Sequence, residues 1–336
     1  MTFTMDRVNL SDIAKALGIS QATVSRALRN KSGVSPQLRE QIFKVAQDLN
    51  YPFKLPKDRG FKRVGIIIPD FSNPFFATVC YGIESVLRSN GYLTYLVNTD
   101  EDWELELDAV RSFLEESVAG LIVAPAANSE RIYENIGGKP LVFFDRHYES
   151  LNAQSVLVDN EDIIFQAVHH LVDSGHKNNC LVSGYQPIYT GRTRTLGFTK
   201  AIELLGLKKQ NCPIVEGNFR EPEAYEATKV ALKKYKPTAI VATSNKTSLG
   251  VLRALRELGL SIPNDVSFIG FDNLEWMELN DPPITTIVQP AFTMGTLAAS
   301  LLLQQIHGHP SSESVVLKAE IKYRSSVRRI GEQNVV

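Results

Sequence analysis

From Val64 onward, short runs of consecutive apolar residues alternate with longer stretches whose apolar positions recur at helical spacing. Runs such as VGIIIP at 64–69, AGLIVAP at 119–125 and VSFIGFD at 266–272 have the length of strands that are buried on both faces. Alternation of such strands with helices predicts parallel sheets that are covered by helices on both faces. The roughly 270 residues of this region are long for one such sheet and suit two.

Residues 9–50 follow a different pattern, in which three short helical stretches are separated by capping residues. Asn9, Ser20 and Ser35 are placed as N-caps, and Gly18 can end the first helix in the left-handed conformation. Two short helices that are joined by a tight glycine turn and braced by a third helix form a helix-turn-helix.

Charge divides the chain in the same way. Residues 1–63 carry 12 basic and five acidic side chains, a net charge of +7, whereas the rest of the chain carries 24 and 32, a net charge of −8. A basic segment suits a polyanion, because neutralised phosphates release their counterions. The charge alone would also fit a basic head that is simply solvated. The helices alone would also fit a small helical bundle whose Ser and Thr residues are merely caps. Turn chemistry and charge together favour DNA binding.

The second helix of a helix-turn-helix enters the major groove with its N-terminus first. We therefore expect Gln21, Ala22, Ser25 and Arg26 to meet base edges. Glutamine suits an adenine edge, arginine a guanine edge, and alanine a thymine methyl group. Phosphate contacts are expected from polar residues near the helix starts, namely Asn9, Ser20, Thr23 and Ser35.

Polar and aromatic side chains follow the carboxyl ends of six predicted strands, where ligands of open parallel sheets bind. Carboxylates, amides and guanidiniums around aromatic rings are the chemistry of sugar recognition. A single aspartate after a strand is more often a helix cap or turn former, so only the six strand ends together indicate a site. These residues are Asp70, Asn73, Phe75, Phe76, Asp145, Arg146, Arg192, Arg194, Phe219, Ser244, Asn245, Lys246, Asp272 and Asn273.

Other classes of protein find little support in the sequence. It contains no P-loop, no G-x-G-x-x-G that opens a helix after a strand, no G-x-S-x-G and no metal-spaced histidine pair, so we expect no enzyme, no cofactor and no metal site. The three cysteines, Cys80, Cys180 and Cys212, form no disulfide framework. The first residues lack the pattern of a secretory signal, and no apolar run approaches the roughly 20 residues of a membrane helix. We expect a cytoplasmic protein.

The stretch LSDIAKALGISQATVSRALRNKSGVSPQLREQIFKVAQDLNY closely resembles the DNA-binding head of the LacI/GalR (lactose-repressor/galactose-repressor) family of bacterial transcriptional regulators. The resemblance extends over nearly the whole chain. It implies a periplasmic-binding-protein-like body of two doubly wound parallel-sheet subdomains, with three crossovers between them and an effector in the cleft. It also implies effector contacts from Asn73, Phe75, Asp145, Arg194, Phe219, Asn245 and Asp272.

Two departures from the family pattern suggest chemistry of this chain's own. Arg29 stands where the family usually has Asn, which adds a cation for a DNA phosphate. Lys246 stands where Asp is usual, and with Arg146, Arg192 and Arg194 it would place four cations at the cleft. Clustered cations suit phosphate, so one hypothesis is an anionic effector such as a sugar phosphate. The alternative is that Lys246 points to solvent.

The linker at 52–63 is shorter than is usual in the family and lacks the N-x-x-A-R-x-L hinge signature. Pro56 blocks helix propagation from the preceding turn. We expect Lys54 and Lys57 to contact DNA phosphates. Leu55 is a candidate for a side chain that inserts into the minor groove as a wedge.

The predicted organisation has four parts: an all-α helix-turn-helix head at 1–51, a basic hinge at 52–63, an effector-binding and dimerisation domain at 64–330, and a tail at 331–336. The resemblance implies one subdomain at 64–158 with 290–317 and another at 159–289 with 318–330. We predict a homodimer that reads an inverted-repeat operator and represses carbohydrate-related genes under control of a sugar or sugar phosphate. The alternative is a global carbon-catabolite-type regulator controlled by a phosphocarrier protein.

Overall fold

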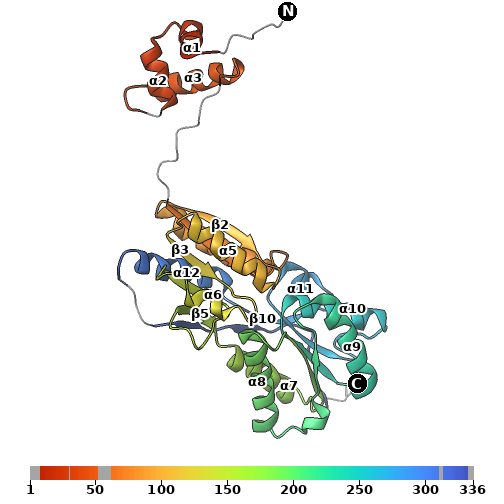
Figure 1. Ribbon diagram of the computed structural model, residues 1–336. Coiled ribbons are helices and arrows are strands. Elements are labelled where there is room, and N and C mark those ends of the chain that lie inside the picture. The colour runs from red at the N-terminus through yellow and green to blue at the C-terminus, as the bar shows by residue number, and fades with distance from the viewer. Residues whose placement is uncertain (1–7, 30, 52–61, 310–312, 332–336) are drawn as a thin grey trace, which may run out of the picture. The chain divides into compact units, whose positions relative to one another are not determined.

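The computed structural model describes residues 8–29, 31–51, 62–309 and 313–331 (Figure 1). The chain divides into two compact units, 1–61 and 62–336. The first unit is called the head and the second the body. The linker residues that are predicted to contact DNA are Lys54, Leu55 and Lys57, and they lie outside the described residues.

The described part of the head is a bundle of three helices, as the pattern of caps predicts. They are α1 (Leu10–Leu17), α2 (Gln21–Leu28) and α3 (Pro36–Asp48). Ile13, Val24, Ala27 and Ile42 are fully buried at the centre of the bundle. One apolar stripe from each helix therefore meets the other two, and the predicted helix-turn-helix fold is confirmed.

The predicted caps of the head are also confirmed. Asn9 Oδ1 accepts a hydrogen bond from Ser11 N, and Asp12 Oδ2 accepts one from Asn9 N, both at 2.8 Å, which completes a capping box. Gly18 ends α1 with a φ of 64°, a left-handed conformation that favours glycine. Ser20 Oγ accepts from the third backbone N–H of α2 at 3.1 Å.

Within its described residues, the body contains two six-stranded sheets. The first has the order β11-β5-β4-β3-β1-β2 and is parallel throughout, and the second has the order β12-β10-β9-β8-β6-β7, with only β12 antiparallel. The first sheet comprises β1 (Lys62–Ile68), β2 (Tyr92–Asn98), β3 (Gly120–Val123), β4 (Leu141–Phe144), β5 (Gln154–Val158) and β11 (Val315–Leu317). The second comprises β6 (Asn179–Ser183), β7 (Ile214–Glu216), β8 (Ala239–Ala242), β9 (Ser267–Phe271), β10 (Thr285–Val288) and β12 (Glu320–Lys322).

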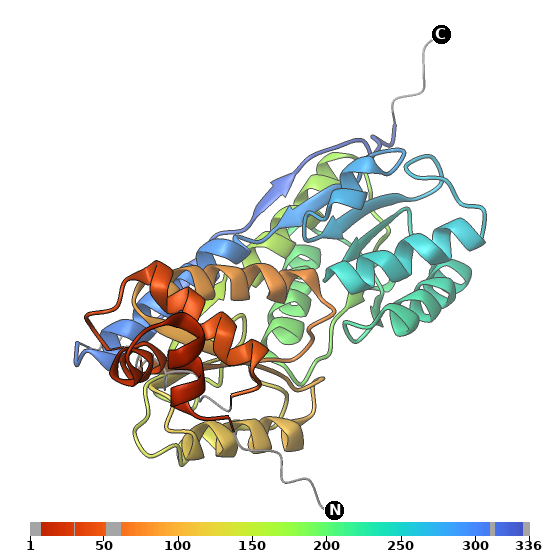
Figure 2. The ribbon, with the colours of Figure 1, turned by 90° about the horizontal axis from the view of Figure 1, so that it is seen from above.

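Helices cover both faces of each sheet. The first half of the body, built on the first sheet, contains α4 (Pro74–Ser89), α5 (Trp103–Glu115), α6 (Glu130–Glu134) and α12 (Ala291–Ile306). The second half, built on the second sheet, contains α7 (Asn160–Asp173), α8 (Tyr189–Leu204), η1 (Lys209–Asn211), α9 (Glu221–Tyr235), α10 (Asn245–Glu257) and α11 (Glu275–Leu279). Helices α9 and α10 run side by side (Figures 1 and 2). The apolar cluster beneath them is separate from the cluster that α7 and α8 cover.

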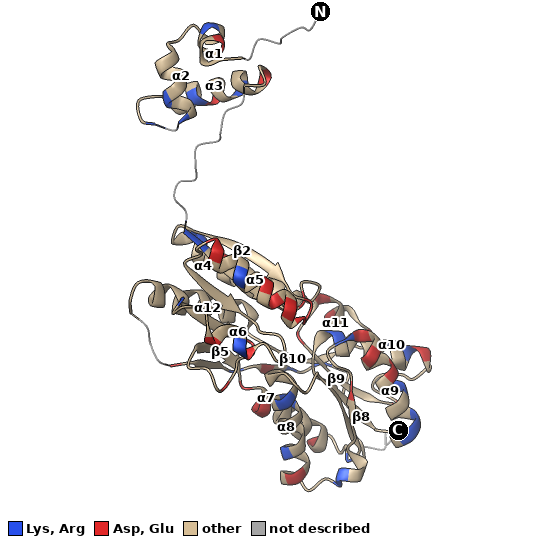
Figure 3. Ribbon diagram, viewed as in Figure 1, with Lys and Arg blue, Asp and Glu red and all other residues tan. Residues whose placement is uncertain are grey.

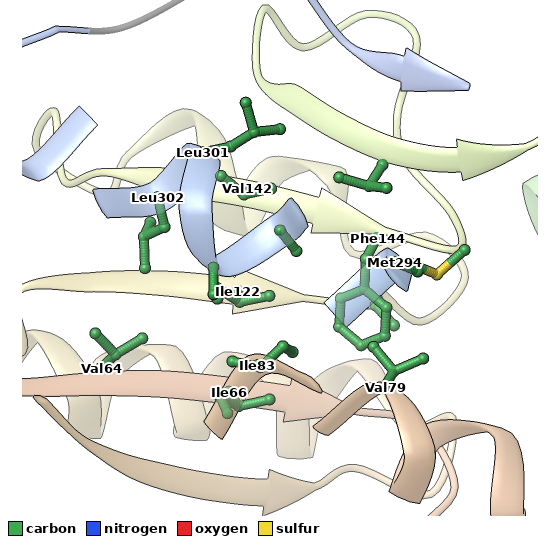
Figure 4. Close-up of a cluster of buried hydrophobic side chains, with 14 of the residues drawn as sticks. Val64, Ile66, Val79, Ile83, Ile122, Val142, Phe144, Met294, Leu301 and Leu302 are labelled. Atoms are coloured by element: carbon green, nitrogen blue, oxygen red, sulfur yellow. The ribbon is translucent and has the colours of Figure 1, made fainter. Parts of the chain in front are cut away.

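The burial of both faces of β1 explains why its successive positions are apolar. Ile66 and Ile68 belong to the core cluster that α4 and α12 cover, whereas Ile67 points to the opposite face and packs in the cluster beneath α5. Figure 4 shows the first of these clusters, with side chains of α4, α12 and neighbouring strands around Ile66. Both faces of the strand are buried, as in the doubly wound fold that the sequence predicts.

The chain passes between the halves three times, after β5, after β10 and between β11 and β12. Two of these crossovers are tied by Lys318, whose Nζ lies 2.7 Å from Asp159 Oδ2. Each sheet therefore belongs to one half of the body, and the three crossovers join the two halves.

Candidate functional site

The exposed face of α2 carries the residues that are predicted to read DNA. Gln21, Ala22 and Arg26 are exposed and Ser25 is half-buried, whereas Val24 points into the core. Arg26 lies along the helix, because its Nε donates to Ala22 O at 3.3 Å. Lys and Arg outnumber Asp and Glu in the described part of the head (Figure 3). This face has the polarity and charge of a nucleic-acid interface.

The residues predicted to meet phosphates lie at helix ends. Ser20 and Thr23 bond each other through their hydroxyl groups at 2.9 Å, and Arg29 is exposed at the end of α2. Arg39 was missed by the sequence patterns, and its Nη2 donates to Lys31 O at 2.8 Å. This bond braces the connection between α2 and α3, a tertiary contact for which the sequence carries no signal.

The body contains a cleft of about 400 Å³ at the carboxyl ends of the strands, lined by residues of both halves. The predicted residues that line it are Asp70, Asn73, Phe75, Phe76, Asp145, Arg146, Arg194, Phe219, Ser244, Lys246 and Asp272. Three predicted residues do not line it, namely Arg192, Asn245 and Asn273. The rule that places a site at the strand ends therefore brings most of its residues together.

Arg194 lines the cleft and is only 4% exposed. Its Nε donates to Asn160 Oδ1 at 2.7 Å, its Nη1 to Thr243 O at 2.6 Å and its Nη2 to Gln289 Oε1 at 3.1 Å. A guanidinium has five N–H groups, so two remain for a ligand. Burial lowers the pKa of Arg194, and the opposing attraction of the nearby Asp145 favours its charged form.

Aromatic rings hold the Arg194 guanidinium in place. Its Cζ lies 4.1 Å from the centroid of the Phe271 ring and 5.6 Å from that of Phe219. Phe219 has a φ of 59° and follows Asn218, whose φ is 50°. Two consecutive left-handed residues that are not glycine store backbone strain, which is typical of a functional site.

Arg146 is buried on the opposite wall, and its donors are engaged within the protein. Nη1 and Nη2 donate to the two carboxylate oxygens of Glu101 at 2.7 and 3.0 Å, and Nε donates to Asp145 Oδ2 at 3.3 Å. Nη1 also donates to Pro125 O. A bidentate pair of this kind is strong, so Arg146 has little capacity left for a ligand phosphate.

Two aspartates accept hydrogen bonds in the cleft, each directly after a buried strand. Asp145 follows β4 and Asp272 follows β9, with φ angles of 62° and 61°. Burial raises the pKa of both carboxyl groups. Asp272 accepts from Asn245 Nδ2 at 2.7 Å and from Gln289 Nε2 at 2.9 Å.

Three of the four predicted cations line the cleft, and Arg192 does not. Arg192 is exposed on α8, where its Nη1 donates to Pro187 O at 2.8 Å. Residues two positions apart on a helix point in different directions, so Arg192 and Arg194 do not share a face. The cations of the lining are Arg146, Arg194, Arg220 and Lys246, and the carboxylates are Asp70, Asp100, Glu101, Asp145, Glu221, Glu223 and Asp272. Carboxylates therefore outnumber cations along this cleft.

Several residues of the cleft were missed by the sequence patterns. Gln289 directly follows β10, and Asn160 lies two residues after β5. Both were within reach of the strand-end rule, because each comes where a strand leaves its sheet. Glu101 and Arg220 carried no such signal, because they come from loops whose course only the folded chain defines.

Two further findings concern the described ranges only. Every helix there is too short or too polar to cross a lipid bilayer. No group of three or more His, Cys, Asp and Glu side chains within those ranges is arranged to hold a metal ion.

Comparison with known proteins gives matches over both units. The profile described as bacterial regulatory proteins, lacI family, matches residues 9–52, and that of the periplasmic binding protein-like domain matches residues 168–327. Catabolite control protein A of Priestia megaterium is 33% identical over 331 residues, covering 96% of this chain and 99% of that protein. The HTH-type transcriptional repressor PurR of Vibrio vulnificus is 30% identical over 330 residues, with the same coverage. A solved structure, a LacI family transcriptional regulator from Enterococcus faecium with bound ribose, has a TM-score of 0.73 at 29% identity and covers 80% of this chain and 100% of that chain.

Proposed function

This chain belongs to the lacI family of bacterial regulatory proteins and is a DNA-binding transcriptional regulator with a cleft for a small effector, and we propose that it is a repressor whose operator affinity is switched by a neutral sugar. The observation that carries the choice of effector is the lining of the cleft. It offers carboxylates and a positioned guanidinium beside an aromatic ring, in a volume of about 400 Å³.

A neutral sugar fits this lining better than a sugar phosphate. Asp145 and Asp272 can accept hydrogen bonds from ring hydroxyls, and Arg194 can donate to them. Glu223 adds a carboxylate whose Oε2 has no hydrogen-bond partner within the described ranges. A phosphate would meet more carboxylates than cations, and Arg146 is already paired with Glu101. The similar regulator with bound ribose supports a sugar as the effector class.

Calorimetric titration of the full chain tests the effector class. Ribose and a panel of neutral hexoses are compared with ribose 5-phosphate at constant ionic strength. We expect a neutral sugar to bind and the phosphate to bind at least tenfold more weakly, because each poorly compensated charge costs about 1.4 kcal/mol or more. Tight binding of the phosphate, with no response to the neutral sugars, would contradict this proposal.

We propose that DNA is read by two copies of the chain on an inverted repeat. One helix-turn-helix reads a short half-site, so a symmetric dimer matches a symmetric operator. On this proposal a change in the cleft alters the spacing of the two heads and so the affinity for DNA. The linker cations Lys54 and Lys57 contact phosphates, and the protein acts in the cytoplasm at the nucleoid.

A second candidate is control by a protein partner. It is favoured by the 33% identity to catabolite control protein A over nearly the whole chain. Retention of a phosphorylated phosphocarrier protein on the immobilised full chain, together with no heat signal from any sugar of the panel, would favour this candidate. Binding of a neutral sugar without retention of the phosphocarrier supports the first proposal.

A further inference from the structure

Two segments from different halves of the body are joined by direct hydrogen bonds beside the cleft. One is the connection from β1 to α4, with Ser72 and Asn73, and belongs to the first half of the body. The other is the start of α10, with Asn245 and Lys246, and belongs to the second half. Asn245 Nδ2 donates to Asn73 Oδ1 at 2.7 Å, and Lys246 Nζ donates to Ser72 Oγ at 2.8 Å.

We propose that these two bonds form a latch that holds the halves of the body together before an effector enters. The latch consists of the pairs Ser72–Lys246 and Asn73–Asn245. It makes Lys246 a positioning residue for the cleft, rather than a contact for a phosphate group.

Both N–H donors of the Asn245 side chain are engaged within the protein. An asparagine side chain has two N–H donors, and Asn245 uses them on Asn73 Oδ1 and on Asp272 Oδ2, both at 2.7 Å. Asn73 Oδ1 also accepts from Phe75 N at 2.9 Å, which caps α4. Asn245 is 3% exposed, so its bonds are shielded from water. Breaking the pair leaves a buried amide donor without a partner, which is costly.

The Ser72–Lys246 pair requires a donor at position 246. Ser72 Oγ donates its only hydrogen to Asp70 Oδ1 at 2.6 Å, so the hydroxyl presents only lone pairs to the other half. The lysine ammonium supplies the missing donor. A carboxylate at position 246 would face these lone pairs and be repelled. The lysine is half-buried and therefore held rather than free in solvent.

The latch gives effector binding a specific consequence. Asn73 lines the cleft and Asn245 does not, so a ligand hydroxyl that donates to Asn73 Oδ1 would compete with Asn245 Nδ2 for that oxygen. Displacing Asn245 from Asn73 exchanges a direct bond between the halves for one that passes through the ligand. The ligand then shifts the balance between closed and open arrangements by its different affinity for the two. This regulatory role depends on the proposed function, whereas the latch itself rests on the two hydrogen bonds between the halves.

Hydrogen–deuterium exchange of the ligand-free full chain tests the latch. The reporter segments are 71–78, which contains the Phe75 amide bonded to Asn73, and 243–250, which contains the start of α10. Lys246→Met keeps the length of the side chain and the helix propensity but removes the donor. We expect exchange of 71–78 to become about five- to tenfold faster, the loss expected for one hydrogen bond. Ser72→Ala should accelerate exchange of 243–250 to the same degree.

The double variant and a matched lysine provide the controls. Because Ser72 and Lys246 form one contact, the double variant should exchange no faster than the faster single variant. Lys229→Met removes a lysine that bonds Glu257 within the second half, so exchange of 71–78 should stay unchanged. Acceleration confined to the segment that carries the substitution, or multiplied effects in the double variant, would overturn the latch. Neither result concerns sugar binding, so failure of the latch leaves the proposed function intact, and failure of the calorimetric test leaves the latch intact.

Discussion

At the scale of single residues, the chain places different chemistry at equivalent local positions. Asp145 and Asp272 both follow buried strands in left-handed conformations, yet only Asp272 accepts amide hydrogen bonds from Asn245 and Gln289. Arg146 and Arg194 are both buried, yet Arg146 is neutralised by a bidentate carboxylate, whereas Arg194 donates to the neutral groups of Asn160, Thr243 and Gln289. The neighbours of each residue therefore decide what it offers to a ligand.

Arg26 supports a prediction at this scale. Its position on the exposed face of α2 suits a guanine edge in the major groove. Arg26→Ala should remove preference at one base position, with a loss of about 1–3 kcal/mol of discrimination. Sequences selected from a random DNA pool by the native chain and by the variant give the measurement. Arg29→Ala is the control, because loss of a phosphate contact weakens binding to all sequences alike. Unchanged preference in the Arg26 variant would refute the assigned role.

At the scale of elements, the close approach of α4 and α12 fixes the first half of the body. Gly82 and Gly295 lie where the two helices touch, and a Cβ on Gly82 would lie 2.4 Å from the backbone oxygen of Phe292. A Cβ on Gly295 would lie 2.1 Å from Val79 O. Both contacts are with backbone atoms, which cannot move aside without separating the helices. Local patterns indicate both helices, but not that two glycines let them meet.

Gly82→Ala should therefore destabilise the body despite the better helix propensity of alanine. We expect the free energy of unfolding to fall by about 1–3 kcal/mol, the cost typical of overpacking. Urea denaturation followed by circular dichroism measures it. Ser89→Ala on the exposed end of α4 is the control and should change the free energy by less than about 0.5 kcal/mol. Equal stability of the two variants would show that α4 and α12 can separate at no cost.

At the scale of the whole molecule, the C-terminal segment is tied to the second half through a buried histidine. His176 is fully buried, with Nδ1 2.9 Å from Thr238 Oγ1 and Nε2 3.0 Å from Arg328 O. The carbonyl oxygen accepts, so Nε2 carries the proton in the neutral ring. Burial lowers the pKa of His176 below its ordinary value of 6.5. The folded chain therefore binds this proton less readily than the unfolded chain does.

This linkage predicts how stability depends on pH. The contribution of His176 is fully present above its unfolded pKa of 6.5 and is lost as the pH falls from there toward the lower pKa of the folded state. The slope from one such group is at most about 1.4 kcal/mol per pH unit. His176→Gln removes the titration, so the difference in unfolding free energy between the variant and the native chain should change below pH 6.5 and stay level above it. A difference that is constant from pH 5 to pH 8 would contradict the linkage.

Much of the fold and part of the candidate site were predictable from local patterns. Caps such as Asn9 and Ser20 act through atoms two or three residues away, so sequence spacing alone identifies them. Arg192 and Arg194 show the limit of this reasoning. Both follow the same strand, and only their angular positions on α8 decide that Arg194 lines the cleft and Arg192 does not.

The sequence by itself determined the three-helix head, the two parallel-sheet halves and the strand ends that line the cleft, because these depend on periodicity and on turn chemistry. Only the tertiary structure decided the charge of the cleft and the pairing of its members. Glu101 neutralises Arg146 across 45 positions, and Asn73 meets Asn245 across 172. Lys246 was a candidate phosphate ligand in the sequence, and the folded chain instead bonds it to Ser72 in the other half of the body. The physical reason is that hydrogen bonds and ion pairs act over a few ångströms in space, irrespective of separation along the chain.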